Sequence, residues 1–115
     1  MRRGAAFIEI NIMKVLFIIN APPYGSERVY NALRLARGLV KKDPATQVTV
    51  FLMADAVLAA KAQQKMPDGY YNIERMLKRA LGGKGIVLLC GTCMDARGMH
   101  ERCRIDRWRQ PQHNG

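Results

Sequence analysis

Apolar residues occur along this chain in two alternating patterns, short continuous runs and helical stripes. Residues 14–20 form a nearly continuous apolar run, 47–53 is rich in β-branched residues, and 86–89 is again apolar. Runs of this length predict strands buried on both faces of a sheet. Between the first two runs, apolar residues recur at helical spacing at Val29, Leu33, Ala36 and Val40. This stripe predicts a helix that ends at Asp43-Pro44.

Polar residues mark the predicted starts of the helices. Ser26 is placed to cap the first helix, and Asn72 is placed to cap the third. Asp55 is placed to cap a short alanine-rich helix that runs to about Gln64. The third helix has an apolar face made of Ile73, Met76, Leu77, Ala80 and Leu81, and Gly82-Gly83 follows it as a stop. The order strand, helix, strand, helices, strand predicts an α/β fold with a parallel sheet and right-handed crossovers.

The length of 115 residues fits one domain with a single core. No apolar window approaches the length of a membrane span, so we expect no membrane association. Glu9 and Asn11 interrupt the apolar residues near the start, which argues against a secretory signal. Three cysteines, an odd number, fit a reducing compartment better than a disulfide scaffold. We therefore expect a cytoplasmic protein.

The chain is strongly basic, with a formal net charge of +10. Most of this charge, +7, belongs to residues 13–98 rather than to the two ends. Such a charge favours an acidic partner, an anionic substrate or a phosphate backbone. The Lys and Arg residues are, however, dispersed over the predicted helices, with few aromatics between them and no known binding motif. We therefore interpret them as solvated helix faces, and nucleic-acid binding is not favoured.

The candidate chemistry lies in the segment Leu89-Cys90-Gly91-Thr92-Cys93-Met94-Asp95-Ala96-Arg97-Gly98. An open α/β sheet places its chemistry at the carboxyl ends of its strands. Two thiols three positions apart fit a redox pair, half of a zinc site or a persulfide carrier. Loop amides and Arg97 are placed to lower the pKa of Cys90 or Cys93. Taken alone, Cys90 also fits a small buried side chain at a strand end, Asp95 a helix cap, and Arg97-Gly98 a simple turn.

Two further blocks accompany the cysteine segment, with Gly69-Tyr70-Tyr71-Asn72-Ile73 before it. They are Asn20-Ala21-Pro22-Pro23-Tyr24-Gly25-Ser26-Glu27 and Phe51-Leu52-Met53-Ala54-Asp55-Ala56-Val57. In this order and spacing, the blocks resemble the DsrE/DsrF-like sulfur-relay family and its YchN-like branch, over roughly residues 13–98. The resemblance implies a three-layer flavodoxin-like open parallel sheet flanked by helices, and homo-oligomers that are trimers or hexamers. It also implies that sulfur passes between proteins as a cysteine persulfide.

The resemblance assigns roles by position. It makes Cys90 the sulfur carrier, because this residue follows the last strand and precedes Arg97-Gly98 by the family's interval. Cys93 belongs to the YchN-like pattern, and whether it resolves, replaces or joins Cys90 is left open. Tyr24-Gly25-Ser26 is expected to form a pocket wall near the cysteines, with Arg97 and Asp95 as supporting residues. Persulfide transfer needs neither a metal nor an organic cofactor, so we expect none.

The end of the chain departs from the family, which continues with a further strand and helix. Residues 99–115 show neither strand nor helix periodicity and hold few apolar residues. Back-translating Arg107–Gly115 and reading one base later gives a segment that looks like the family's, so we interpret the tail as the product of a frameshift. The predicted organisation is an extension at 1–12, a domain at 13–98 that lacks its last strand and helix, and an atypical tail at 99–115.

The leading hypothesis is a sulfur-transfer protein that accepts and passes sulfur through Cys90, with sulfur donor and acceptor proteins as partners. The alternative is a non-catalytic subunit of an oligomer. In that case Cys90 and Cys93 are structural or hold a metal across a subunit interface. The sequence leaves open whether such a carrier counts as an enzyme of the sulfurtransferase type.

Overall fold

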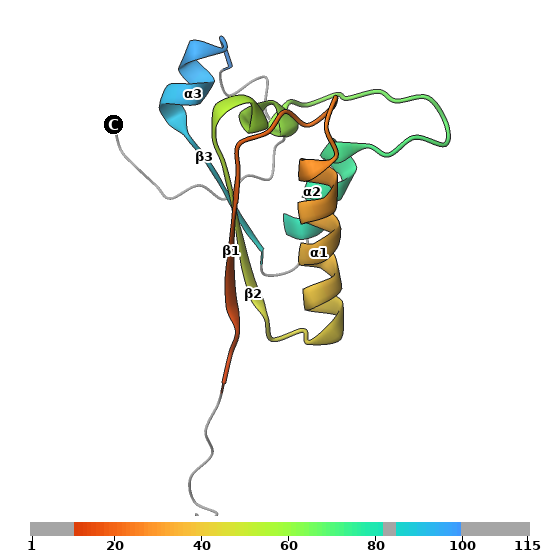
Figure 1. Ribbon diagram of the computed structural model, residues 1–115, viewed down its shortest axis with the longest axis vertical. Coiled ribbons are helices and arrows are strands. Elements are labelled where there is room, and N and C mark those ends of the chain that lie inside the picture. The colour runs from red at the N-terminus through yellow and green to blue at the C-terminus, as the bar shows by residue number, and fades with distance from the viewer. Residues whose placement is uncertain (1–10, 82–84, 100–115) are drawn as a thin grey trace, which may run out of the picture.

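The computed structural model describes residues 11–81 and 85–99, which form one layer of strands with helices beside it (Figure 1). In chain order the elements are β1 (Lys14–Ile19), α1 (Arg28–Lys42), β2 (Gln47–Leu52), the 3₁₀ helix η1 (Ala54–Ala60), α2 (Ile73–Leu81), β3 (Ile86–Leu89) and α3 (Gly91–Ala96). The three strands lie within one or two residues of the ranges that the apolar runs predict. The predicted extension and tail fall mostly outside the described residues.

The sheet is parallel, with strand order β1-β2-β3. Its register pairs Ile19 with Leu52 and Leu52 with Leu89, so the carboxyl ends of all three strands meet at one edge. Parallel neighbours require crossover connections, and helices supply them on the way from β1 to β2 and from β2 to β3. The expected α/β fold, an open parallel sheet with helices, is therefore confirmed.

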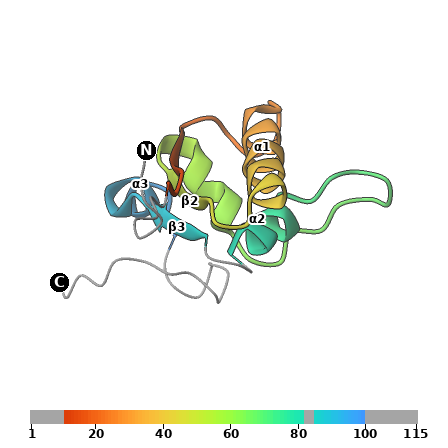
Figure 2. The same cartoon turned by 90° about the horizontal axis from the view of Figure 1, so that it is seen from below.

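Helices α1 and α2 cover the same face of the sheet, as the two views show (Figures 1 and 2). Alternate strand residues point toward them, among them the fully buried Val50, Leu52 and Val87. Ile73 and Leu77 of α2 are also fully buried in this core. Each such side chain contributes roughly 1.5–3 kcal/mol by leaving water. The core therefore lies between the sheet and these two helices.

The opposite face of the sheet corrects one expectation, that β1 is buried on both faces. Leu16 is 57% exposed, Ile18 is 62% exposed, and Ile86 of β3 is 41% exposed. The register sets Leu16 and Ile86 on either side of Thr49, and Ile18 beside Phe51, so these side chains share one face. No described helix covers the middle of that face (Figure 2). Continuous apolar composition therefore did not imply burial here, and we call this surface the open sheet face.

Three local expectations about helix boundaries can be compared with the structure. Asn72 caps α2 as predicted, because its Oδ1 accepts a hydrogen bond from the Arg75 amide at 3.0 Å. Ser26 is not the cap residue of α1, because Glu27 takes that position and makes no side-chain cap bond. The Ser26 hydroxyl nevertheless accepts a hydrogen bond from the Arg28 amide at 3.2 Å, which satisfies an amide at the start of α1. The alanine-rich helix is a 3₁₀ helix that ends at Ala60 rather than near Gln64, and Met53, not Asp55, precedes it.

Candidate functional site

The cysteine segment lies where the sheet ends. The Cys90 amide donates to the Leu52 carbonyl at 3.0 Å, which extends the ladder between β2 and β3 by one residue. Cys90 then turns out of the strand and becomes the N-cap residue of α3. Its side chain is partly exposed and carries a free thiol. The fold thus places a thiol at the carboxyl edge of the sheet, where the sequence predicts one.

The surroundings of Cys90 favour its thiolate. The Cys93 amide donates to Cys90 Sγ at 3.4 Å across the first turn of α3. The pKa of Cys90 is lowered from its ordinary value, first by a hydrogen bond from the Cys93 side chain and then by the Cys93 amide. Burial opposes the shift, while the Thr92 amide and the positive charge of Arg97 add to it. Donors that point at a sulfur stabilise its negative charge, so the thiolate form of Cys90 is favoured.

Cys93 is held from a different side. Its Sγ accepts a hydrogen bond from the Ala54 amide at 3.2 Å, which joins α3 to the start of η1. Ala54 has a φ of +52°, a left-handed conformation that residues with a Cβ rarely adopt. Such a conformation costs on the order of 1 kcal/mol or more and is kept only where the surrounding contacts enforce it. The strained turn therefore directs an amide at the second cysteine.

Arg97 connects the same two segments. Its Nε donates to Asp55 Oδ1 at 2.8 Å, and its Nη1 donates to the Cys93 carbonyl at 3.0 Å. The two side chains of the ion pair are 28% and 54% exposed. Arg97 therefore acts in two ways: it fixes the cysteine helix on η1, and it places a positive charge near Cys90.

The end of α3 also resolves the expectations for Asp95 and Gly98. The Gly98 amide donates to the Asp95 carbonyl at 3.1 Å and the Met99 amide to the Met94 carbonyl at 3.0 Å. Gly98 adopts a φ of +68°, and Met99 is buried. These bonds form the Schellman motif that ends a helix at a glycine. Asp95 is thus not a helix cap, since it lies inside α3, where Cys90 takes the cap position.

The loop Tyr24-Gly25-Ser26 makes its contacts away from the cysteines. The Tyr24 hydroxyl donates to Gln64 Oε1 and accepts from the Ile73 amide, and the Tyr24 ring stacks on Tyr71 at 5.9 Å. Gly25 provides a turn with a φ of +89°. Tyr24 forms no hydrogen bond or ring contact with either cysteine, so its role as a pocket wall stays a prediction. The structure brings together Cys90, Cys93 and Arg97.

Two residues of this site lie outside the sequence prediction. Ala54 contributes a backbone amide, a role that no side-chain pattern indicates. The sequence predicts a helix cap for Asp55, but its carboxylate accepts a hydrogen bond from Arg97 instead. The sequence feature that indicates this role is the position of Asp55 shortly after β2, at the edge of the sheet where the cysteine segment also begins.

A metal site would need ligands beyond this part of the fold. Within residues 11–81 and 85–99, no group of three or more His, Cys, Asp or Glu side chains is arranged to hold a metal ion. Among the same residues, no helix combines the length and the apolar character needed to cross a membrane.

A parallel sheet with a partly exposed thiol at its carboxyl edge defines a small α/β protein with a candidate cysteine site. The chain belongs to the DsrE/DsrF-like family, whose model matches residues 13–106. Protein YchN of Escherichia coli (strain K12) is 40% identical over 95 residues, which cover 83% of this chain and 80% of YchN. The uncharacterised protein MJ0989 of Methanocaldococcus jannaschii is 38% identical over 94 residues, 82% of this chain and 80% of that protein.

Solved structures support the same assignment. The crystal structure of YchN from E. coli superposes with a TM-score of 0.79 at 39% identity, covering 85% of this chain and 82% of that one. The protein of unknown function MTH1491 from Methanobacterium thermoautotrophicum gives a TM-score of 0.70 at 14% identity, covering 86% and 81%. At that identity the second likeness concerns the fold alone. The fold and the family are therefore established.

Proposed function

We propose that this protein carries sulfur as a persulfide on Cys90 in a sulfur relay. The observation that carries the proposal is the position of Cys90, a partly exposed thiol at the sheet edge whose pKa is lowered by the Cys93 side chain and amide. A thiolate is the nucleophile in sulfur exchange, and a lower pKa raises its fraction near neutral pH. Membership of the DsrE/DsrF-like family supports a relay role.

The reaction is a sulfur transfer with no net oxidation. The Cys90 thiolate attacks the terminal sulfur of a donor protein's persulfide. A sulfur–sulfur bond forms on Cys90 while the donor's sulfur–sulfur bond breaks, and the donor leaves as a thiolate. The proton of the terminal sulfur stays on that sulfur, so atoms and charge balance. The reverse step delivers the sulfur to an acceptor thiolate, in the manner of thiol–disulfide exchange.

Cys93 and Arg97 support this chemistry from either side of Cys90. The Cys93 side chain and amide stabilise the thiolate before attack and after the persulfide has been delivered. Arg97 holds α3 against η1 through Asp55 and adds a favourable charge. The proposed chemistry uses both cysteines as free thiols, which a reducing compartment maintains, and this supports a cytoplasmic location.

The proposed assembly is a homo-oligomer that buries the open sheet face. Leu16, Ile18 and Ile86 are large apolar side chains exposed on that face. A second copy offers the same apolar surface, which an isologous interface buries on both sides at once. The tail at 99–115 is less suited to cover the open sheet face than a second copy is, because the tail carries four arginines and few apolar residues.

A second candidate function, a structural subunit whose cysteines only stabilise the fold, is favoured by one contact. Cys93 Sγ accepts the Ala54 amide and thereby joins α3 to η1. In this case Cys93 is a fixed acceptor, and Cys90 is never loaded with sulfur. The two candidates differ in whether a persulfide forms.

The test is mass spectrometry of the full chain after incubation with a cysteine desulfurase, cysteine and pyridoxal phosphate. We expect a gain of about 32 Da, one sulfur atom, on the peptide that contains Cys90. Cys90→Ser should abolish the gain, while Cys93→Ser should keep it. The desulfurase supplies the persulfide, so the reaction needs no further reagent.

Two results would decide against the proposal. One is absence of the mass gain in folded protein whose thiols are shown to be free by titration. The other is a gain that persists in Cys90→Ser and disappears in Cys93→Ser, which would move the carrier to Cys93. If a Cys90→Ser, Cys93→Ser double variant binds the same partner proteins as the unchanged chain, this result would favour the structural subunit.

A further inference from the structure

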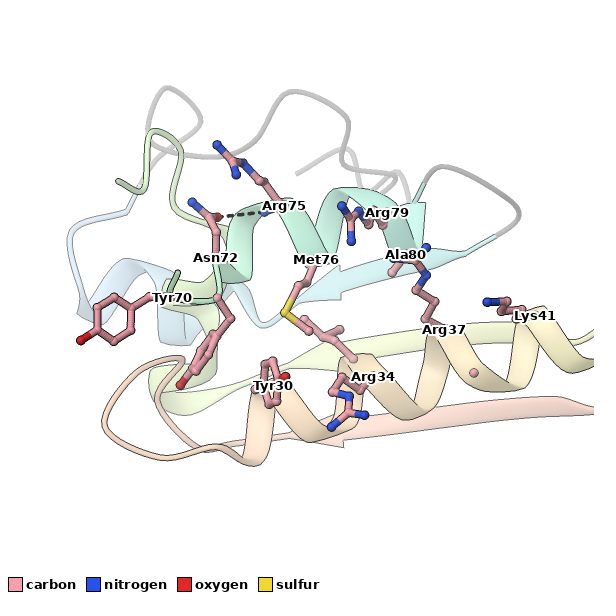
Figure 3. Close-up of a pocket in the computed structure, with 13 residues that line it drawn as sticks. Tyr30, Arg34, Arg37, Lys41, Tyr70, Asn72, Arg75, Met76, Arg79 and Ala80 are labelled. Carbon is pink, nitrogen blue, oxygen red and sulfur yellow. Dashed lines mark hydrogen bonds between the residues drawn. The ribbon is translucent and has the colours of Figure 1, made fainter. Parts of the chain in front are cut away.

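A groove between α1 and α2 lies outside the cysteine site. It has a volume of about 510 Å³, and both helices contribute to its walls (Figure 3). Its floor is apolar, with Leu33 from α1 and Met76 and Ala80 from α2. Pockets for small molecules usually occupy roughly 300–1,000 Å³ and combine an apolar floor with a few polar groups. The groove therefore has the size and the lining of a ligand site.

The charges that line the groove are all positive. Five cations border it, and no Asp or Glu does: Arg34, Arg37, Lys41, Arg75 and Arg79. Within the part of the chain that the structure describes, none of the five takes part in an ion pair. All five are exposed, and like charges gathered along one groove give it a positive potential that attracts anions. The unbalanced charge therefore indicates an anionic ligand.

Aromatic rings gather at one end of the same groove. Tyr30 and Tyr71 lie in contact with ring centroids 4.4 Å apart, and the Arg34 guanidinium lies over the Tyr30 ring at 5.6 Å. Tyr70, also in the lining, is 69% exposed. Figure 3 shows Tyr70 near Asn72 at the start of α2, while Arg37 and Lys41 lie toward the other end of the groove. The groove thus has an aromatic end and a cationic end.

We propose that this groove binds a nucleoside polyphosphate, with the base at the tyrosines and the phosphates between the arginines. Guanidinium groups bind phosphate oxygens through charge-assisted hydrogen bonds, which are stronger than neutral ones. The exposed Tyr70 ring offers a face for stacking a base. This inference goes beyond sulfur transfer and does not depend on either cysteine.

A small ligand fits the groove better than a nucleic acid or a peptide. Helix α2 has 9 residues, so the cationic walls extend only about 13 Å. A single strand of RNA is usually bound over at least about four nucleotides, which exceeds that length. An acidic amphipathic helix would likewise need a longer groove for its successive turns. The short length of the cationic walls and the separate aromatic end together favour a nucleotide as the ligand.

The test is isothermal titration calorimetry of the full chain with ATP, tripolyphosphate and adenosine at near-physiological ionic strength. We expect ATP to bind, tripolyphosphate to bind more weakly, and adenosine not to bind measurably. In Arg37→Gln with Arg79→Gln, ATP affinity should fall about tenfold or more, because two charge-assisted contacts are lost. Tyr70→Ala should weaken the affinity for ATP several-fold and leave the affinity for tripolyphosphate unchanged.

The matched control removes two exposed cations that do not line the groove, in Arg28→Gln with Lys42→Gln. ATP affinity in this variant should stay within about twofold of the unchanged chain. Equal weakening in both double variants would show general charge attraction and overturn the proposal, as would absence of ATP binding. Groove-dependent binding of a single-stranded RNA or an acidic peptide, without ATP binding, would overturn the nucleotide assignment. Equal affinity for ATP and tripolyphosphate would overturn the role of the aromatic end.

Discussion

Arg97 and Asp55, 42 positions apart in the chain, are joined by a hydrogen bond of 2.8 Å between Nε and Oδ1. The contact links the end of the cysteine helix α3 to the first turn of η1. Arg97 also donates to the Cys93 carbonyl within α3, so its guanidinium joins the cysteine helix to η1. A pair this exposed contributes little to global stability. Its importance lies in where it holds the cysteines.

The first prediction concerns this ion pair. Asp55→Asn should lower the rate of Cys90 alkylation near pH 6 by about twofold to threefold, because Arg97 is held less firmly near the thiol. The midpoint of urea unfolding should change little. The measurement is iodoacetamide labelling followed by peptide mass analysis. Asp68→Asn, at an exposed position in the loop before α2, serves as the matched control. A loss of reactivity in both variants would contradict a local role.

The second prediction concerns the pH dependence of Cys90. Its pKa lies below the ordinary thiol value, mainly because the Cys93 side chain and amide donate to it. The thiolate is therefore present at pH values where a free cysteine is still protonated, and it is lost as pH falls through the lowered pKa. In Cys93→Ala the midpoint of the alkylation profile should move to higher pH. Cys93→Ser keeps a hydrogen-bond donor and should move it less. Identical profiles for all three proteins would refute the assigned cause.

The third prediction concerns Glu74 at the start of α2. Burial raises the pKa of Glu74, but the Gln64 amide and Lys78 outweigh this, so the net pKa lies below its usual value. A lowered carboxyl pKa stabilises the fold above the unfolded pKa of about 4.3, and this stabilisation disappears as pH falls through the folded pKa. Glu74→Gln should reduce the free energy of unfolding by about 1 kcal/mol at neutral pH.

The check on Glu74 is urea unfolding at neutral pH and at about pH 3, below the usual glutamate pKa. The difference between Glu74→Gln and the unchanged chain should shrink at the lower pH, because Glu74 is then protonated. Lys78→Gln should have the smaller effect of the two, since the Lys78 side chain is 48% exposed. A difference that is constant with pH would point to packing rather than charge.

The fourth prediction concerns the open sheet face. Leu16→Asp with Ile18→Asp should weaken self-association about 100-fold or more, because association would then bury unpaired carboxylates. Leu35→Asp is the matched control, since Leu35 is 56% exposed on α1 rather than on this face. Sedimentation velocity at several concentrations measures the effect. A monomeric unchanged chain, or equal weakening by the control, would rule out this interface.

Much of the fold could be predicted from apolar spacing. Continuous runs located the three strands, and the stripe through Val29, Leu33 and Ala36 located α1, whose buried residues are these three. The same reasoning failed for the surroundings of β1. A run such as Val15 to Ile19 shows that a strand forms, but which of its faces is covered depends on helices elsewhere in the chain. For that reason Leu16 and Ile18 were expected in the core and lie on the surface.

The candidate site likewise has features that the sequence predicts and features that only the structure shows. The spacing of Cys90 and Cys93, and the turn at Arg97-Gly98, are local features that the sequence exposes directly. The Ala54 amide and the Asp55 carboxylate reach the cysteines only because β2 and β3 end at the same edge. The cationic groove was also missed, because α1 and α2 each look like a helix with dispersed solvated charges. Only their packing gathers those charges into one place.

By itself the sequence determined the elements and the pair of thiols, since these follow from patterns among residues near in the chain. The alternation of strands and helices also predicted a parallel sheet, but the order β1-β2-β3 came from the structure. Tertiary structure decided that the pKa of Cys90 is lowered, because this pKa depends on donors whose positions are set when α3 folds at the sheet edge. It also decided which surfaces remain open. Electrostatic and apolar contacts act over a few ångströms of space, and only folding brings distant residues within that range.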